Sequence, residues 1–226
     1  MKSGLRTSAL NVLSLMLPWP LRRRWLAFWF RYELHPESHI GWSWVLPGSL
    51  QMGRGATIGH LTVCKGLDLV ELHDYASLGP MNWITGTPSS DPRHYTRMPD
   101  RRPSLVIGRH AAVTGRHYFD CTDSVTVGPF STVAGIRSQF WTHGLDISGG
   151  YQAANPISIG SYCMVGTGVV CLGGSEIPDR CIVAAGAVVV GRLREPLKSY
   201  AGAPARPVGD VSPDAAYFHR TTGYVA

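Results

Sequence analysis

The chain has 226 residues, of which 44% are hydrophobic and 16% are charged, a balance typical of globular proteins rather than disordered ones. Its 26 glycines and 16 prolines favour many short strands joined by tight turns over a helical bundle. The formal net charge is +6, but no long basic arm interleaved with aromatic residues runs through the sequence. Nucleic acid is therefore not an expected partner.

Residues 1–36 are apolar, aromatic and basic, and we predict that they form a helical segment. The apolar run ALNVLSLML (9–17) is too short to span a bilayer and is followed by Pro18 and Pro20. The next stretch, LRRRWLAFWFRYEL (21–34), mixes aromatic rings with arginines. Two interpretations stay open: the segment lies on an anionic membrane surface, or it packs against the rest of the chain or an oligomer partner.

The five cysteines are odd in number and include no CxxC pair, which argues against a zinc site and against a secreted disulfide framework. We therefore expect reduced thiols in a cytoplasmic protein, with peripheral contact at the inner face of the membrane as a further possibility. No metal site is expected, because the His, Cys, Asp and Glu residues show no ligand spacing.

From residue 40 onward, apolar residues recur at every sixth position. Glycine often follows the apolar residue, and a small side chain often stands four positions after it. The period is clearest at Ile159, Val165, Cys171, Ile177, Val183 and Val189.

A six-residue period does not fit a continuous α-helix, because six is not a multiple of 3.6. A chain that turns a corner after each short strand explains it: the large residue fills the interior and glycine permits the bend. Three sides then make one coil of 18 residues, and stacked coils hydrogen-bond as parallel sheets. Ile159 should therefore lie against Ile177, and Val165 against Val183.

The pattern resembles that of the hexapeptide-repeat acyltransferases, and in particular of enzymes that O-acetylate sugars and polysaccharides. The stretches GGSEIPDRCIVAAGAVVV (173–190) and YAGAPARPV (200–208) look like the closing coils of that family. The resemblance implies an all-β fold, with a left-handed parallel β-helix over residues 37–210 and a tail over 211–226. It also implies a homotrimer that binds acetyl-CoA between adjacent β-helices.

The six-residue period fails over residues 76–106 and 137–157, where we expect loops extruded from the coil. The second loop contains WTHGLD (141–146). In the resembling family the catalytic histidine lies in such a loop after a threonine, and His143 matches that position. Imidazole is suited to accept a proton near neutral pH, so we predict that His143 is a general base.

A catalytic imidazole needs a partner that orients its second nitrogen. Asp146 lies three residues after His143, whereas Asp120 and Asp123 lie about one coil earlier. The period slips by two residues around FDCTDS (119–124), so the sequence leaves the choice among the three aspartates open.

The resemblance also assigns residues to acetyl-CoA. It places the pantetheine arm along the late coils at Thr167, Ala185 and Gly186, and a phosphate of the nucleotide at Arg206. For the acceptor, we predict that aromatic side chains stack on a sugar ring, and that a histidine in a slot usually held by a small inward residue lies at the edge of the site. These acceptor residues are Trp83, Trp141 and Tyr151, with His117 as the histidine.

Together these features predict an acetyl-CoA-dependent O-acyltransferase that acts on a sugar hydroxyl in polysaccharide or glycolipid biosynthesis. The transfer would be direct, since no acyl-enzyme is needed when both substrates meet at the base. Two alternatives remain: an N-acetyltransferase acting on an amino-sugar nucleotide or an antibiotic-type acceptor, and a β-helical scaffold without catalysis.

Overall fold

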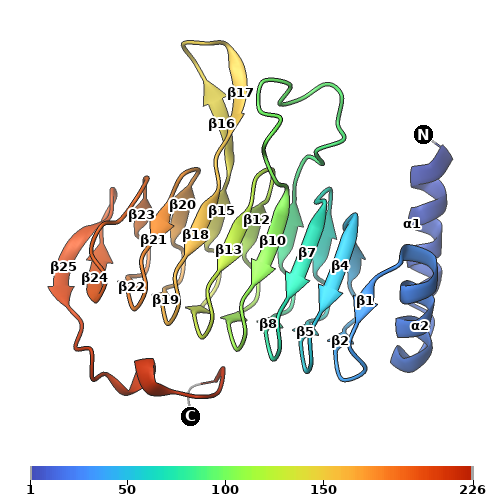
Figure 1. Ribbon diagram of the computed structural model, residues 1–226, viewed down its shortest axis with the longest axis horizontal. Coiled ribbons are helices and arrows are strands. Elements are labelled where there is room, and N and C mark those ends of the chain that lie inside the picture. Colours follow the sequence, from blue (N-terminus) through green and yellow to red (C-terminus); the bar gives the residue numbers. More distant parts are fainter. Residues whose placement is uncertain (1, 225–226) are drawn as a thin grey trace.

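The computed structural model describes residues 2–224, and for residues 2–5 the backbone alone. It is a parallel β-helix of stacked three-sided coils, with a helical pair at its N-terminal end (Figure 1). The two helices are α1 (Lys2–Ser14) and α2 (Trp19–Phe30). Neither has the length and apolar content of a membrane-spanning helix, and no other α-helix occurs in the described residues.

The strands form three sheets, one for each side of the prism. The first contains β1 (Glu33–Leu34), β4 (Ser49–Met52), β7 (Leu69–Leu72), β10 (Ser104–Ile107), β13 (Val125–Val127), β18 (Ile157–Ile159) and β21 (Glu176–Ile177). The second contains β2 (His39–Ile40), β5 (Thr57–Ile58), β8 (Ser77–Leu78), β11 (Ala112–Val113), β14 (Thr132–Val133), β19 (Met164–Val165), β22 (Ile182–Val183), β24 (Lys198–Ala201) and β25 (Arg206–Asp210). The third contains β3 (Trp44–Leu46), β6 (Val63–Lys65), β9 (Trp83–Thr85), β12 (Tyr118–Asp120), β15 (Gln139–Trp141), β20 (Val170–Leu172) and β23 (Val188–Val189).

The register confirms the predicted stacking. Ile159 pairs with Ile177, and Val165 pairs with Val183, in parallel ladders. All three main sheets are parallel except for the last pair, β24 and β25. The fold is therefore the predicted all-β, left-handed parallel β-helix.

The coils differ in length, which the sequence period of 18 did not predict. Ser158 pairs with Glu176, 18 positions later, but Ser49 pairs with Leu69, 20 positions later. The extra residues lie at the corner between the third and first sheets, where Leu67 adds a further buried side chain. The slip around FDCTDS is the same wide corner two turns further along, with Cys121 buried there.

The two loops are shorter than predicted. Residues 76–106 contain β8, β9 and β10, so the chain leaves the coil only over residues 86–103. The repeat was hidden because Asn82 occupies a small-residue slot and donates hydrogen bonds to the carbonyls of Gly79 and Thr114. Residues 137–157 likewise contain β15 and the start of β18, and the small inward residue of that coil is Ser138, not Arg137.

The core is a column of aliphatic, aromatic and cysteine side chains inside the prism. Phe119 and Phe140, from neighbouring coils, are fully buried and stacked with ring centroids 4.5 Å apart. All five cysteines are buried and free. Burial raises the pKa of the Cys171 thiol to about 12, so this sulfur stays protonated and unreactive.

Candidate active site

The two segments that interrupt the coil leave the prism at one edge, the corner between the third and first sheets. The loop over residues 86–103 follows β9, and the hairpin of β16 (His143–Asp146) and β17 (Tyr151–Ala154) follows β15. The intervening coil has its wide corner at residues 121–124. In Figure 1 the loop and the hairpin project side by side from the same edge of the coil.

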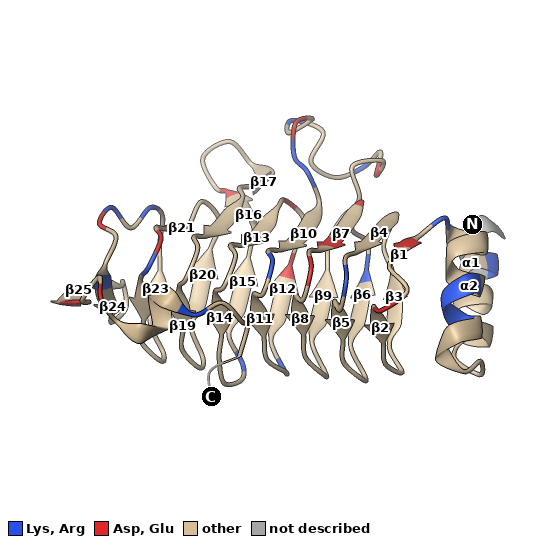
Figure 2. Cartoon of the chain, turned by 60° about the horizontal axis from the view of Figure 1, so that its bottom comes forward, with Lys and Arg blue, Asp and Glu red and all other residues tan. Residues whose placement is uncertain are grey.

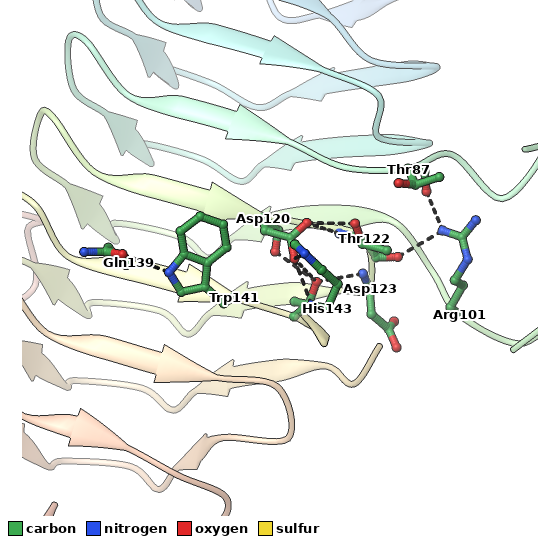
Figure 3. A network of polar contacts seen from close by, with 9 residues as sticks. Thr87, Arg101, Asp120, Thr122, Asp123, Gln139, Trp141 and His143 are labelled. Carbon is green, nitrogen blue, oxygen red and sulfur yellow. Dashed lines mark hydrogen bonds and ion pairs between the residues drawn. The ribbon is translucent and has the colours of Figure 1, made fainter. Parts of the chain in front are cut away.

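His143 stands at the base of the hairpin and contacts Asp120, the last residue of β12. Its Nδ1 lies 2.6 Å from Oδ2 of Asp120, and its backbone N–H donates to the same oxygen at 2.8 Å (Figure 3). The register produces this contact: Asp120 pairs with Trp141, so the chain reaches His143 just beyond the end of the ladder.

The groups around the Asp120 side chain are hydrogen-bond donors. Its Oδ1 accepts the hydroxyl of Thr122 at 2.7 Å and the Thr122 backbone N–H at 3.2 Å. The hydroxyl of Thr142 lies 3.0 Å from Oδ2. Only 6% of the Asp120 side chain is exposed. A buried side chain that only accepts hydrogen bonds is in the environment of a carboxylate, and this carboxylate fixes the imidazole.

The opposite edge of the His143 ring is open. Its side chain is 45% exposed, and no described residue hydrogen-bonds Nε2. Because Nδ1 faces a carboxylate, the neutral ring carries its proton on Nδ1 and keeps the Nε2 lone pair free. The ring of Trp141 lies edge-on beside it, with centroids 6.1 Å apart. The arrangement can accept a proton from a group that approaches Nε2.

The structure does not bring the other two predicted aspartates to His143. Asp146 lies at the turn of the hairpin, where its Oδ1 accepts the backbone N–H of Gly149 at 2.6 Å. Asp123 accepts the backbone N–H groups of Ser124 at 2.7 Å and Arg102 at 3.1 Å. Both carboxylates therefore hold loop backbone in place, and only Asp120 contacts the imidazole.

The sequence analysis expected His117 at the edge of the site, but the structure does not place it there. It is fully buried inside the coil, where Ser138 donates its backbone N–H to Nδ1 at 3.1 Å and the Thr114 hydroxyl lies 2.9 Å from Nε2. Burial lowers the pKa of His117 to about 4, so the ring is neutral and occupies the slot as a structural residue.

The predicted acceptor-stacking residues are spread over three elements. Trp141 is exposed beside His143, and Tyr151 lies on the hairpin with Arg97 over its ring at 5.0 Å. Trp83 is exposed on the outer face of the third sheet, two coils away from Trp141. Only Trp141 is therefore brought to the imidazole.

The residues assigned to acetyl-CoA lie on a different edge of the prism, the corner between the second and third sheets. Ala185 and Gly186 are exposed there, and the backbone N–H of Gly186 donates to the carbonyl of Thr167. Gly186 has a φ of +72° and nothing within 4 Å of the position of a Cβ, so this corner is open. Arg206 is exposed on β25.

Sequence reasoning missed three residues that build the site. Thr122 and Thr142 donate to Asp120, and only their places beside Asp120 and His143 in the chain could have indicated them. Arg101 is buried and donates to the carbonyls of Thr87, Pro88 and Thr122, which fastens the loop over residues 86–103 to the corner (Figure 3). Within the described residues, no cluster of His, Cys, Asp and Glu is arranged to hold a metal ion.

No protein-family model matches the sequence, and no curated protein sequence matches it. Solved structures are similar to it. The polysialic acid O-acetyltransferase OatWY superposes with a TM-score of 0.64 at 15% identity, over 79% of this chain and 84% of that one. A variant of the N-acyltransferase AntD from Bacillus cereus, in complex with dTDP and coenzyme A, has a TM-score of 0.52 at 12% identity, over 87% and 92%. The chain thus has the fold of these acyltransferases, the left-handed parallel β-helix of the hexapeptide-repeat type.

Proposed function

We propose that this protein is an acetyl-CoA-dependent O-acyltransferase that transfers an acetyl group to a sugar hydroxyl in polysaccharide or glycolipid biosynthesis. The observation that carries the proposal is the pair of His143 and Asp120, in which a buried carboxylate fixes one ring nitrogen and leaves the other open at a break in the coil. The fold, shared with an O-acetyltransferase and an N-acyltransferase, supports the reaction class.

The proposed mechanism is direct transfer with His143 as general base. Nε2 takes the proton of the acceptor hydroxyl while its oxygen attacks the thioester carbonyl, and Asp120 stabilises the imidazolium that forms. The tetrahedral intermediate then collapses, the C–S bond breaks, and the imidazolium returns the proton to the thiolate of coenzyme A. Acetyl-CoA supplies the activated acyl group, and no covalent enzyme intermediate is required.

We propose that the acceptor sits between the loop over residues 86–103 and the hairpin. A cleft of about 330 Å³ lies there, lined by Arg93, His94 and Arg97 of the loop and by Tyr151 and Gln152 of the hairpin. Gln152 pairs with Leu145, two residues beyond His143, so the cleft begins about 7 Å along the strand from the base. Two arginines in it favour an acceptor that carries a carboxylate or phosphate near the reacting hydroxyl.

We propose a homotrimer, with acetyl-CoA bound by Thr167, Ala185, Gly186 and Arg206. Support comes from the separation of the two sets of residues: the catalytic pair and the cofactor residues lie on different edges of one prism. In a trimer, one edge of each chain adjoins a different edge of its neighbour, which brings both sets to one groove. The exposed Trp83 and Tyr118 on the sheet between these edges are suited to such an interface.

We further propose that the protein works in the cytoplasm, at the inner face of the membrane. Its five buried free thiols support a reducing compartment.

The proposed function is tested by replacing His143 with alanine and following acetyl transfer from acetyl-CoA to carboxylated, neutral and amino-sugar acceptors by mass spectrometry. Loss of a positioned general base should lower kcat about 10²–10⁴-fold. The matched control is His73→Ala, because His73 is equally exposed and also faces a carboxylate, Glu71 at 3.2 Å. Full activity of the His143 variant would refute the proposed base, and a product on the amino sugar alone would replace O-transfer by N-transfer.

A further inference from the structure

Helix α1 has its polar and apolar faces reversed relative to an ordinary surface helix. Asn11 and Ser14 face the β-helix and are completely buried. Val12 and Leu13 are exposed, and Met16, two residues after the end of the helix, is 85% exposed. A helix that covers a globular core normally buries its apolar stripe, so this arrangement indicates that the outward face has another partner.

Helix α2 shows the reversal in part: Leu26 is buried in the core, but other apolar side chains of the helix are exposed. Arg22 is buried, whereas Leu21, Phe28 and Trp29 are exposed, with Phe28 77% exposed. The nearby coil adds Trp42, which is 70% exposed and shares a cleft with Leu17, Pro18 and Trp19 of the helical pair.

The reversal has a physical cause at the open end of the β-helix. The first coil has no coil before it, so its backbone carbonyls lack strand partners on that side. Polar side chains of the helices supply the missing donors: Asn11 donates to the carbonyl of Val45 at 2.9 Å, and Arg22 to those of Gly41 at 2.7 Å and Ser43 at 3.0 Å. Because polar side chains take these inner positions, Val12 and Leu13 of α1 and Leu21, Phe28 and Trp29 of α2 are left exposed, while Leu26 still packs in the core.

The charge of the protein is concentrated in the same segment. Residues 1–32 contain six basic residues and no acidic ones, so they carry a net charge of +6. The remaining 194 residues contain fifteen basic and fifteen acidic residues and are neutral overall. Figure 2 shows the basic residues on the helical pair, while both colours alternate over the coils. Arg6, Arg24 and Arg31 are exposed on this part of the chain.

We propose that the outward face of α1 and α2 docks on an anionic phospholipid bilayer. The docking surface consists of Val12, Leu13, Met16, Leu21, Phe28 and Trp29, with Arg6, Arg24 and Arg31 around it. Exposed aromatic and aliphatic side chains enter the headgroup region, while arginines bind the lipid phosphates. The net charge of +6 distinguishes this occupant from a second copy of the chain, because two such surfaces would repel each other.

Docking through this face fixes the height of the catalytic site above the membrane. The helices lie across the end of the coil, so the axis of the β-helix points away from the bilayer (Figure 1). The strand β12, with Asp120, is three strands above β3, or about 14 Å, and the helical layer adds about 10 Å. If the proposed function is correct, the acceptor is then a glycan that extends about 25 Å from the bilayer, rather than a lipid headgroup.

The test is cosedimentation of the full chain with vesicles of phosphatidylcholine, with and without phosphatidylglycerol. We expect binding to the anionic vesicles alone, weakened by salt. Reversing two charges (Arg24→Glu with Arg31→Glu) and removing two apolar groups (Met16→Ser with Phe28→Ser) should each lower the partition coefficient about tenfold or more. The matched control, Arg194→Glu with Val208→Ser, changes equally exposed residues at the other end of the chain and should bind normally.

Equal binding to both vesicle types, or unchanged binding of both docking-surface variants, would overturn the proposal. Concentration-dependent self-association that the Met16 and Phe28 replacements abolish, without vesicle binding, would assign the surface to a second copy. Circular dichroism confirms that each variant folds. Acetyl transfer to a free oligosaccharide should stay within about twofold in these variants, so a failure of docking and a failure of the proposed function give different results.

Discussion

Replacing Asp120 with asparagine tests the carboxylate–imidazole pair with almost no change in shape. The aspartate accepts N–H donors on both oxygens, from Thr122 on Oδ1 and from His143 on Oδ2. An asparagine amide has one oxygen and one NH₂ group, so in either orientation its NH₂ faces a backbone N–H. We therefore expect a loss of stability of about 1–3 kcal/mol, the cost of one buried donor without a partner.

The effect on catalysis should be larger. The 2.6 Å contact between Nδ1 and Oδ2 is a charge-assisted hydrogen bond that strengthens as the imidazolium forms. Its loss alone contributes about 1.5–3 kcal/mol, or roughly 10–150-fold in rate. An NH₂ group facing Nδ1 also favours the tautomer with its proton on Nε2, which cannot accept the proton of the acceptor. We expect kcat to fall at least about 100-fold, with little change in the KM for acetyl-CoA.

The assay is release of the coenzyme A thiol under saturating substrates, after unfolding in urea has shown that the variant is folded at the assay temperature. Asp123→Asn is the matched control, since Asp123 is also buried and also accepts backbone N–H groups but does not touch His143. It should keep its rate within about threefold. A folded Asp120→Asn enzyme with a rate within threefold of the parent would refute the assignment of Asp120 as the orienting partner.

Three further predictions concern the core, the pH dependence of stability and the cofactor. Phe119→Ala removes one ring of the stacked pair and should lower the free energy of unfolding by about 3–5 kcal/mol in urea titrations. The pKa of His117 is about 4 in the folded chain and near 6.5 in the unfolded one, so the unfolded chain binds the extra proton. The free energy of unfolding should therefore fall by up to about 3 kcal/mol from pH 7 to pH 4. This decrease should be smaller in the His117→Asn variant. Arg206→Ala should raise the KM for acetyl-CoA without changing kcat. A KM equal to that of the parent enzyme would contradict the proposed role of Arg206 in binding acetyl-CoA.

The regular part of the fold could be predicted because large apolar residues recur along the chain at the positions that face the interior. From Ile159 to Val189 each inward position is apolar at intervals of six, and the observed ladders follow that spacing. The prediction failed where a polar residue fills an inward slot and satisfies its hydrogen bonds locally. Asn82 and His117 are such residues, and each was assigned to an irregular or functional region instead of the core.

The candidate base could be predicted, but its partner could not. His143 was indicated by a broken period and by the threonine before it. Asp120 is 23 positions away, and its contact depends on the wide corner that gives this coil its extra residues. Asp146 is nearer in the sequence, but its carboxylate accepts the Gly149 N–H in the turn of the hairpin. An 18-residue period carries no information on which corner is widened, so the register at Asp120 had to come from the structure.

The register also explains how the position of His143 stays fixed although irregular segments lie on both sides of the site. Asp120 and Trp141 are fixed against each other by the parallel ladder of β12 and β15, and Phe119 stacks on Phe140 beneath them. The position of His143 therefore depends on two residues after a rigid strand, and not on the length of the hairpin that follows it. Loop and hairpin can differ in sequence to suit an acceptor, while the distance between Nδ1 and Oδ2 stays set by the stacked coils.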